Sequence, residues 1–172
     1  KKKLSKMIIN ERVGTVAEQS ISQSIDCLDL DWYETTKRIQ RKRTRGGKDV
    51  AIKFLKDKQR LHDGDILFMD DETAIVVNVL ETKTIVLSPQ SILEMSALCH
   101  EIGNKHLPLY NENDLLLMPF ELTIFRWLES SGYNPKVQDL KLLHLLNANV
   151  DHHRETKVGG SMSTKNLKIK LS

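Results

Sequence analysis

The side chains in this chain best suited to chemistry are its histidines, because imidazole binds transition metals and exchanges protons near neutral pH. There are six of them: His62, His100, His106, His144, His152 and His153. His62 lies in an acidic turn, His100 in the last turn of a predicted helix and His144 after a predicted strand, where solvated or partly buried structural roles are expected. His106 differs, because it follows directly after that helix ends. We expect its side chain at an exposed helix-to-strand corner, with an ordinary surface histidine as the alternative.

A single imidazole holds a metal weakly, because transition ions need several ligands. In a symmetric dimer, a residue on the twofold axis meets its own copy, so one His106 per chain becomes two ligands at one site. His152 and His153 lie in a polar segment near the end of the chain and supply further imidazoles. We therefore predict an open, exchangeable metal site made of His106, His152 and His153, and no catalytic residues.

The composition is that of a folded protein without the usual enzyme signatures. Of 172 residues, 40% are hydrophobic, 28% charged and 5% aromatic, which excludes a collagen-like or wholly disordered chain. The two cysteines, Cys27 and Cys99, have no paired spacing, so neither a disulfide nor a zinc knuckle is expected. The sequence contains no phosphate-binding loop, GxSxG, HExxH or GxGxxG motif. We therefore expect a protein that is not an enzyme.

The formal net charge of +3 says little about partners, because four of the 26 basic residues lie within residues 1–6. Without them, acidic residues outnumber basic ones by one. We interpret residues 1–6 as an N-terminal extension ahead of Met7. No apolar run reaches the roughly 18 residues of a membrane span, and the apolar stretch after the basic start is too short for a signal peptide. We expect a cytoplasmic protein without membrane contact.

Residues 7–80 have the pattern of a β-rich domain. Val50, Ile52 and Phe54 alternate with polar or small residues, as in a half-buried strand. Two Asp-rich turns follow and separate further short apolar runs. The predicted fold class is α+β, beginning with an all-β small barrel or sandwich.

Residues 81–148 have the order strand, helix, strand, strand, helix, strand, which is typical of a ferredoxin-like βαββαβ domain. Strands are predicted at 84–87, 106–110, 115–117 and 136–142, and helices at 92–102 and from 119 to 132. The second helix is predicted to open at Pro119 and to end at Gly132.

The first helix carries the clearest local signals. Ser91 and Glu94 form a predicted capping box, in which the two residues satisfy free N–H groups at the start of the helix. Gly103 is predicted to end the helix in the left-handed conformation. The predicted buried stripe consists of Ile92, Met95, Cys99 and Ile102.

Residues 149–172 are predicted to form a flexible, His-containing tail, because they are mostly polar and include Gly159 and Gly160. At the end of the tail the residues alternate between apolar and polar, so this end can add a strand to another element. The apolar positions are Leu167, Ile169 and Leu171, and the polar ones are Asn166, Lys168 and Lys170.

Residues 99–109 read CHEIGNKHLPL and resemble the signature YHLGNRHVPL of the UreE family of urease accessory proteins, which are nickel metallochaperones. The N-terminal half resembles the same family independently. It does so through Cys27 to Trp32, the basic stretch 37–45, Gly47 to Ala51 and Leu61 to Leu67. The resemblance covers about residues 8–146.

This resemblance implies an N-terminal domain that binds partner peptides and a ferredoxin-like domain that binds metal and dimerises. It implies that His106 binds one Ni(2+) with its symmetry mate, while Zn(2+) or Cu(2+) are possible in vitro because imidazole suits all three. The implied partners are a second copy, with a dimer of dimers as a further assembly, a urease maturation GTPase and the urease assembly complex. Nucleic acid is not among them.

Three departures from the family pattern qualify these implications. Lys105 stands where Arg is usual, which keeps the charge but loses the planar fork. Residues 114–119 lack the histidine pair of some relatives, which argues against extra surface metal sites. Only His152 and His153 stand where several relatives have a polyhistidine tail, which favours delivery over storage.

Two other function classes stay open at this point. An RNA-binding β-domain protein would place Arg41, Arg43 and Arg45 on one strand face along phosphates, although aromatic residues do not interleave with them. A metal-dependent hydrolase would need a metal-bound water beside a general base. Glu101 is acidic and near His106, but the sequence shows no three-ligand site within one chain.

Overall fold

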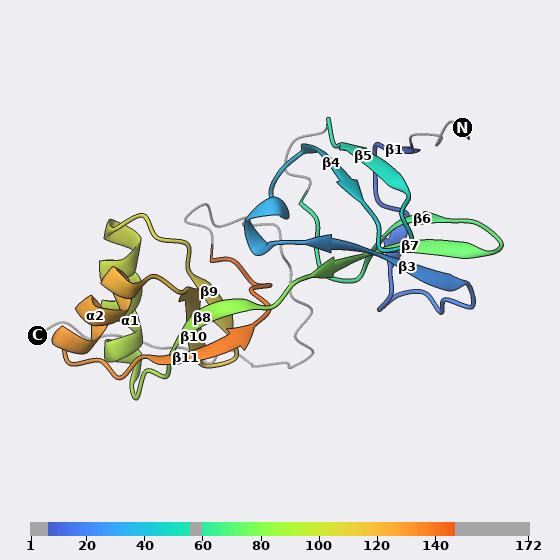
Figure 1. Ribbon diagram of the computed structural model, residues 1–172. Coiled ribbons are helices and arrows are strands. Elements are labelled where there is room, and N and C mark those ends of the chain that lie inside the picture. Colours follow the sequence, from blue (N-terminus) through green and yellow to red (C-terminus); the bar gives the residue numbers. More distant parts are fainter. Residues whose placement is uncertain (1–6, 56–59, 147–172) are drawn as a thin grey trace, which may run out of the picture.

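The computed structural model describes residues 7–55 and 60–146, and the statements below concern these residues. His152 and His153, the predicted tail 149–172 and the predicted extension 1–6 lie outside the described residues. The first half contains β1 (Met7–Ile9), β2 (Gly14–Thr15), β3 (Ser24–Leu30), the 3-10 helix η1 (Trp32–Glu34), β4 (Ile39–Arg43), β5 (Asp49–Lys53), β6 (Asp65–Met69) and β7 (Thr73–Val79). The second half contains β8 (Thr82–Leu87), α1 (Ile92–Asn104), β9 (Tyr110–Glu112), β10 (Leu115–Pro119), α2 (Leu122–Ser130) and β11 (Lys136–Leu140) (Figure 1).

The strands of the first half form two sheets, with the orders β1-β5-β4 and β2-β6-β7-β3. The two sheets share one core, to which β5 contributes Val50 and Ile52 and β3 contributes Leu28 and Leu30. The described strands do not close into a barrel. Of the two predicted arrangements, the sandwich is therefore the one observed.

The alternation predicted around β5 is confirmed for Val50, Ile52 and Phe54, which are all buried. Ala51 is buried as well, although the alternation placed it on the outer face. The reason is that β5 is the central strand of its sheet, so Ala51 lies between Ile8 of β1 and Arg41 of β4. A small side chain between two longer neighbours is covered by them.

The second half forms one antiparallel sheet with the strand order β11-β8-β10-β9, which is the ferredoxin-like arrangement. Both helices cover one face of this sheet (Figure 1). There, Ile85 and Leu87 of β8 form a core with Leu98 and Ile102 of α1 and Leu128 of α2. The predicted α+β class and the βαββαβ order are confirmed.

The opposite face of this sheet meets the first half of the chain. The ring of Tyr110 in β9 packs edge-on against Trp32 of η1, with 6.1 Å between the ring centroids. Nearby, the Lys141 ammonium donates to the two carboxylate oxygens of Asp63, at 2.9 and 3.1 Å. The halves are therefore joined by apolar and charged contacts besides the chain itself.

The start of α1 differs in two details from the prediction. Ser91 caps the helix as expected, since its Oγ accepts from the N–H of Glu94 at 3.1 Å. The Glu94 carboxylate, however, accepts from the N–H of Gln90 at 2.7 Å rather than from that of Ser91. Ile92 was expected on the buried stripe but is 87% exposed. The buried face contains Leu98, which lies six positions after Ile92, and six positions are not a whole number of helical turns.

The prediction that Pro119 opens the second helix is wrong. Pro119 is the last residue of β10 and lies opposite Thr84 of β8, and the N–H of Phe120 donates to the Lys83 carbonyl. The sheet thus continues past the proline, and α2 starts at Leu122. No helix among the described residues is long and apolar enough to cross a membrane.

Candidate functional site

The carboxyl end of α1 positions His106. The His106 N–H donates to the Gly103 carbonyl at 3.0 Å, and the Leu107 N–H donates to the Ile102 carbonyl at 3.4 Å. These two bonds form the Schellman motif, in which the residue after the helix cap takes a left-handed backbone. That residue is His106, with φ of 54°. Its side chain is exposed, as predicted.

The prediction that Gly103 takes the left-handed position is wrong, because Gly103 lies inside α1. The helix continues to Asn104 and ends where Leu107 packs against the core that contains Ile102. This apolar contact is the usual companion of a Schellman motif. The packing of Leu107 against this core is consistent with a helix stop at this point, and His106 adopts the conformation that glycine usually has.

A left-handed backbone at a residue other than glycine costs about 1 kcal/mol or more. Such strain persists only where the surrounding structure imposes it, and it is concentrated at functional sites. Here the two backbone bonds and the packing of Leu107 impose it on His106. The strain is thus an observation that singles out His106 among the described histidines.

The side chains beside His106 have their own contacts. The Lys105 ammonium lies over the ring of Trp127 in α2, 4.5 Å from its centroid. The side-chain amide nitrogen of Asn104 lies 3.1 Å from Nε2 of His100, within hydrogen-bond distance. Sequence reasoning did not foresee either contact, because each depends on which side chains meet at the helix end.

The other described histidines do not join His106. His62 is exposed, and its Nδ1 lies 3.6 Å from the Asp65 carboxylate. His144 was expected to be partly buried but is exposed. In residues 7–55 and 60–146, no group of three or more His, Cys, Asp or Glu side chains could hold a metal. The described part of one chain therefore offers no site of three such ligands around His106.

The chain leaves the described region beside Leu109 and Tyr110. Leu145 forms an antiparallel bridge with Tyr110, and the Leu146 N–H donates to the Leu109 carbonyl at 2.8 Å. Leu146 is the last described residue, and Leu109 is three residues after His106. The segment that leads to His152 thus starts beside the strand that follows His106.

The basic stretch is less free than the RNA-binding interpretation assumes. Arg43 is paired with Asp49 at 3.1 Å, and Lys42 with Glu34 at 2.6 Å. Arg45 lies beyond the end of β4 and is paired with Asp29 at 2.8 Å, so it does not continue the strand face of Arg41 and Arg43. Much of the positive charge here is already balanced within the fold.

Comparison with known proteins adds a separate finding. The family model "UreE urease accessory protein, N-terminal domain" matches residues 9–80. The chain is 47% identical over 148 residues to "Urease accessory protein UreE" of Flavobacterium johnsoniae, a match that covers 86% of this chain and 90% of that protein. It is 36% identical over 147 residues to the protein of that name from Actinobacillus pleuropneumoniae, with coverage of 83% and 79%. It is 37% identical over 171 residues to the one from Helicobacter pylori strain Shi470, with coverage of 96% and 95%. The chain therefore belongs to the UreE family of urease accessory proteins.

Proposed function

We propose that this chain is a cytoplasmic nickel metallochaperone that binds Ni(2+) at a homodimer interface and delivers it for assembly of the urease active site. Membership of the UreE family supports the role in urease maturation. The observation that carries the nickel site is His106, exposed at a helix corner with a left-handed backbone. In this proposal residues 81–148 bind metal and dimerise, and residues 7–80 bind partners.

Two copies of His106 on a twofold axis supply two imidazoles to one ion. The anchored start of the tail supports a contribution from His152 and His153, since Leu146 is bonded to Leu109 and His152 follows six residues later. Such a site has few fixed ligands, so it captures and releases its ion easily. That property suits a protein whose metal is cargo for a urease maturation GTPase and the urease assembly complex.

Imidazole binds Ni(2+), Cu(2+) and Zn(2+), and affinity rises toward copper. The ligand type therefore does not select nickel, and we expect Zn(2+) and Cu(2+) to bind in vitro. In this proposal, selection for nickel comes from the partners and from the supply of metal.

The test is a calorimetric titration of the full chain with Ni(2+), alongside His106→Gly and His100→Ala. His106→Gly removes the imidazole at a position whose backbone suits glycine, so the fold is kept. We expect tight binding near one ion per two chains in the wild type, and loss of that binding in His106→Gly. His100→Ala is the matched control and is expected to bind like the wild type. Tight binding by His106→Gly would remove the proposed site.

A chain truncated before Asp151 tests the tail. We expect it to bind Ni(2+) more weakly than the full chain at the same stoichiometry, because His106 is retained and His152 and His153 are lost. Equal affinity would exclude the tail histidines as ligands. One ion per chain in the wild type would argue for separate sites in place of a shared one.

The titration repeated across pH tests the type of ligand. A metal binds the neutral form of imidazole and competes with the proton. We therefore expect the affinity for Ni(2+) to fall as the pH is lowered from 8 to 5, through the ordinary range of imidazole near 6.5. Equal affinity at the two ends of this range would argue against histidine ligation.

A further inference from the structure

The outer edge of β11 is open in the described part of the chain. In the order β11-β8-β10-β9, β11 pairs with β8 on one side and with no described strand on the other. Alternate residues of an edge strand direct N–H and C=O groups outward, which makes the edge a template for another strand. Val137 of β11 lies opposite Ile85, a core residue on the helix side, and is 39% exposed. Val137 is therefore an apolar residue on the helix side of the open edge, a side that it shares with Asp139.

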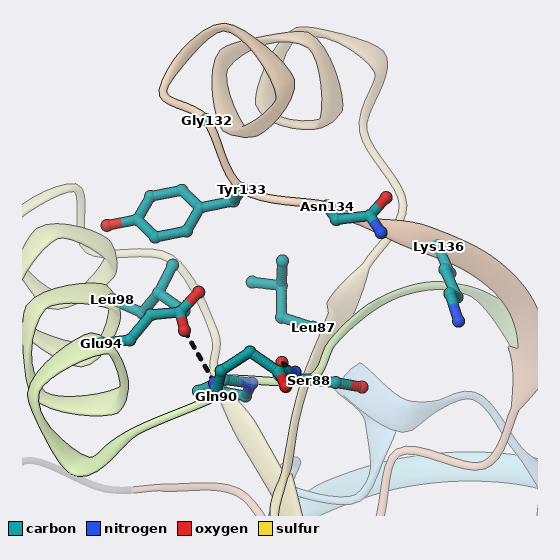
Figure 2. Close-up of a pocket in the computed structure, with 10 residues that line it drawn as sticks. Leu87, Ser88, Gln90, Glu94, Leu98, Gly132, Tyr133, Asn134 and Lys136 are labelled. Atoms are coloured by element: carbon teal, nitrogen blue, oxygen red, sulfur yellow. Dashed lines mark hydrogen bonds between the residues drawn. The ribbon is translucent and has the colours of Figure 1, made fainter.

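A hollow lies at the start of this edge, between the end of β8, the start of α1 and the segment from α2 to β11 (Figure 2). Its volume is about 320 Å³. Leu87 and Leu98 line it with buried apolar side chains, and Lys136 of β11 lies at its rim. Ile92 and Leu93 follow Gln90, another lining residue, and are 87% and 81% exposed. They are the most exposed large hydrophobic side chains among the described residues.

The end of the chain has the pattern that such an edge accepts. A strand formed by residues 166–172 has Leu167, Ile169 and Leu171 on one face, with Lys168 and Lys170 on the other. With its apolar face directed to the helix side, this strand lies along Val137 and Asp139 of β11, and its lysines lie on the side of Lys136 and Gln138, which are exposed. In strand addition, backbone bonds supply affinity and the pockets beneath alternate side chains supply specificity.

The length of the chain permits the contact within one molecule. The bond from Leu146 to Leu109 holds the last described residue next to β9, at the edge of the sheet opposite to β11. Three strand spacings of about 4.8 Å separate these edges by about 14 Å. Residues 147–166 span up to about 66 Å when extended. The chain end therefore reaches β11 with ample slack.

We propose that residues 166–172 dock as an added strand on the outer edge of β11, with Leu167, Ile169 and Leu171 toward Val137 and the hollow. This docking does not depend on nickel. It anchors the segment that carries His152 and His153 at both ends, since Leu146 already holds the other end. The two histidines then remain near the second half of the molecule.

Hydrogen exchange of the full, metal-free chain, followed by mass spectrometry, tests the docking. We expect residues 136–140 and 166–172 to exchange about tenfold or more slowly in the wild type than in Ile169→Asp, which places a charge on the apolar face. Asn166→Asp adds the same charge on the polar face and is expected to exchange like the wild type. Exchange in α1 shows that the fold is intact in all three proteins.

Equal exchange of residues 136–140 in the wild type and Ile169→Asp overturns the proposal. The same loss of protection in Asn166→Asp also overturns it, because the effect would then follow charge and not the apolar face. Protection that grows with protein concentration assigns the edge to a second copy and overturns docking within one chain. Protection that is independent of concentration and lost only in Ile169→Asp supports it.

Discussion

His106 and Gly132 occupy the same position in the motifs that end α1 and α2. At the end of α2, the Gly132 N–H donates to Glu129 and the Tyr133 N–H donates to Leu128, both at 3.1 Å. This repeats the pattern of His106 and Leu107, and φ is 87° at Gly132 and 54° at His106. Thus α2 ends with a glycine, the residue for which a left-handed backbone costs the least free energy, whereas α1 ends with a histidine. Folding alone favours glycine at both ends, so the histidine is consistent with the metal-binding role proposed for it.

The first prediction concerns these two positions. His106→Gly is expected to raise the free energy of unfolding by about 1 kcal/mol, because it removes the cost of a left-handed backbone at a non-glycine residue. Gly132→Ala is expected to lower it by about 1 kcal/mol or more. An added Cβ at Gly132 meets no atom within 4 Å, so the change there acts through the backbone alone. Urea unfolding monitors both variants, and destabilisation by His106→Gly would contradict this account.

The second prediction concerns the start of α1. Ser91→Ala removes the oxygen that accepts from the Glu94 N–H, and is expected to lower the free energy of unfolding by about 1 kcal/mol. Ser96→Ala is the matched control, because the Ser96 hydroxyl bonds to the Ile92 carbonyl within the helix and caps nothing. We expect the control to change stability by less than about 0.5 kcal/mol in thermal or urea unfolding. Equal effects would show that the cap contributes nothing.

The third prediction concerns the contact between the halves. Lys141→Met removes the bonds to Asp63 and to the Asn78 side chain, the latter at 3.0 Å, and keeps most of the aliphatic chain. We expect the free energy of unfolding to fall by about 1 kcal/mol, and the difference to shrink at high salt. Lys53→Met is the control, since Lys53 is exposed and forms no ion pair among the described residues. A loss independent of salt would assign the effect to packing.

The fourth prediction concerns pH. The Arg45 guanidinium, which donates to both carboxylate oxygens of Asp29 at 2.8 Å, lowers the pKa of Asp29 below its usual value. Partial burial opposes this shift, and the Asn78 amide adds to it. A pKa that is lower in the folded state stabilises the fold above the unfolded pKa, near 3.9, and this stabilisation disappears as the pH falls through the folded pKa.

Asp29→Asn is therefore expected to be less stable than the wild type at neutral pH, with a difference that disappears in acid. Urea unfolding between neutral pH and about pH 2 measures it. Asp114→Asn is the control, because Asp114 forms no ion pair among the described residues. A difference that stays constant with pH would show that Asp29 acts through its shape and not through its charge.

Local signals were the most predictable part of this fold. Ser91 caps the start of α1 and Gly132 ends α2, each through contacts with residues nearby in the sequence. Both roles were predicted from residue type and spacing. The failures arose where a distant contact decides. Gly103 was expected to end α1, but the packing of Leu107 extends the helix and moves the left-handed position to His106. Ile92 was expected on the buried face of α1. The buried face is instead the one on which Leu98 packs with the sheet, and Ile92 is exposed.

Some features of the candidate site could likewise be predicted from the sequence and others could not. That His106 follows a helix stop and is exposed could be predicted, because both follow from the order of residues. That Lys105 lies over Trp127, and that Asn104 engages His100, could not be predicted, because these contacts depend on how α1 and α2 end in space. The participation of His152 and His153 stays a prediction, since both lie outside the described residues.

By itself, the sequence determined the βαββαβ order, the position of His106 at a helix corner and the family to which the chain belongs. These properties follow from periodicity, capping residues and motifs, which act over short distances along the chain. Only the tertiary structure decided which residue takes the left-handed conformation, which edge of the sheet has no described strand beside it and how Lys141 joins the two halves. The physical reason is that each of these depends on groups far apart in sequence, which meet only once the sheets and helices have packed.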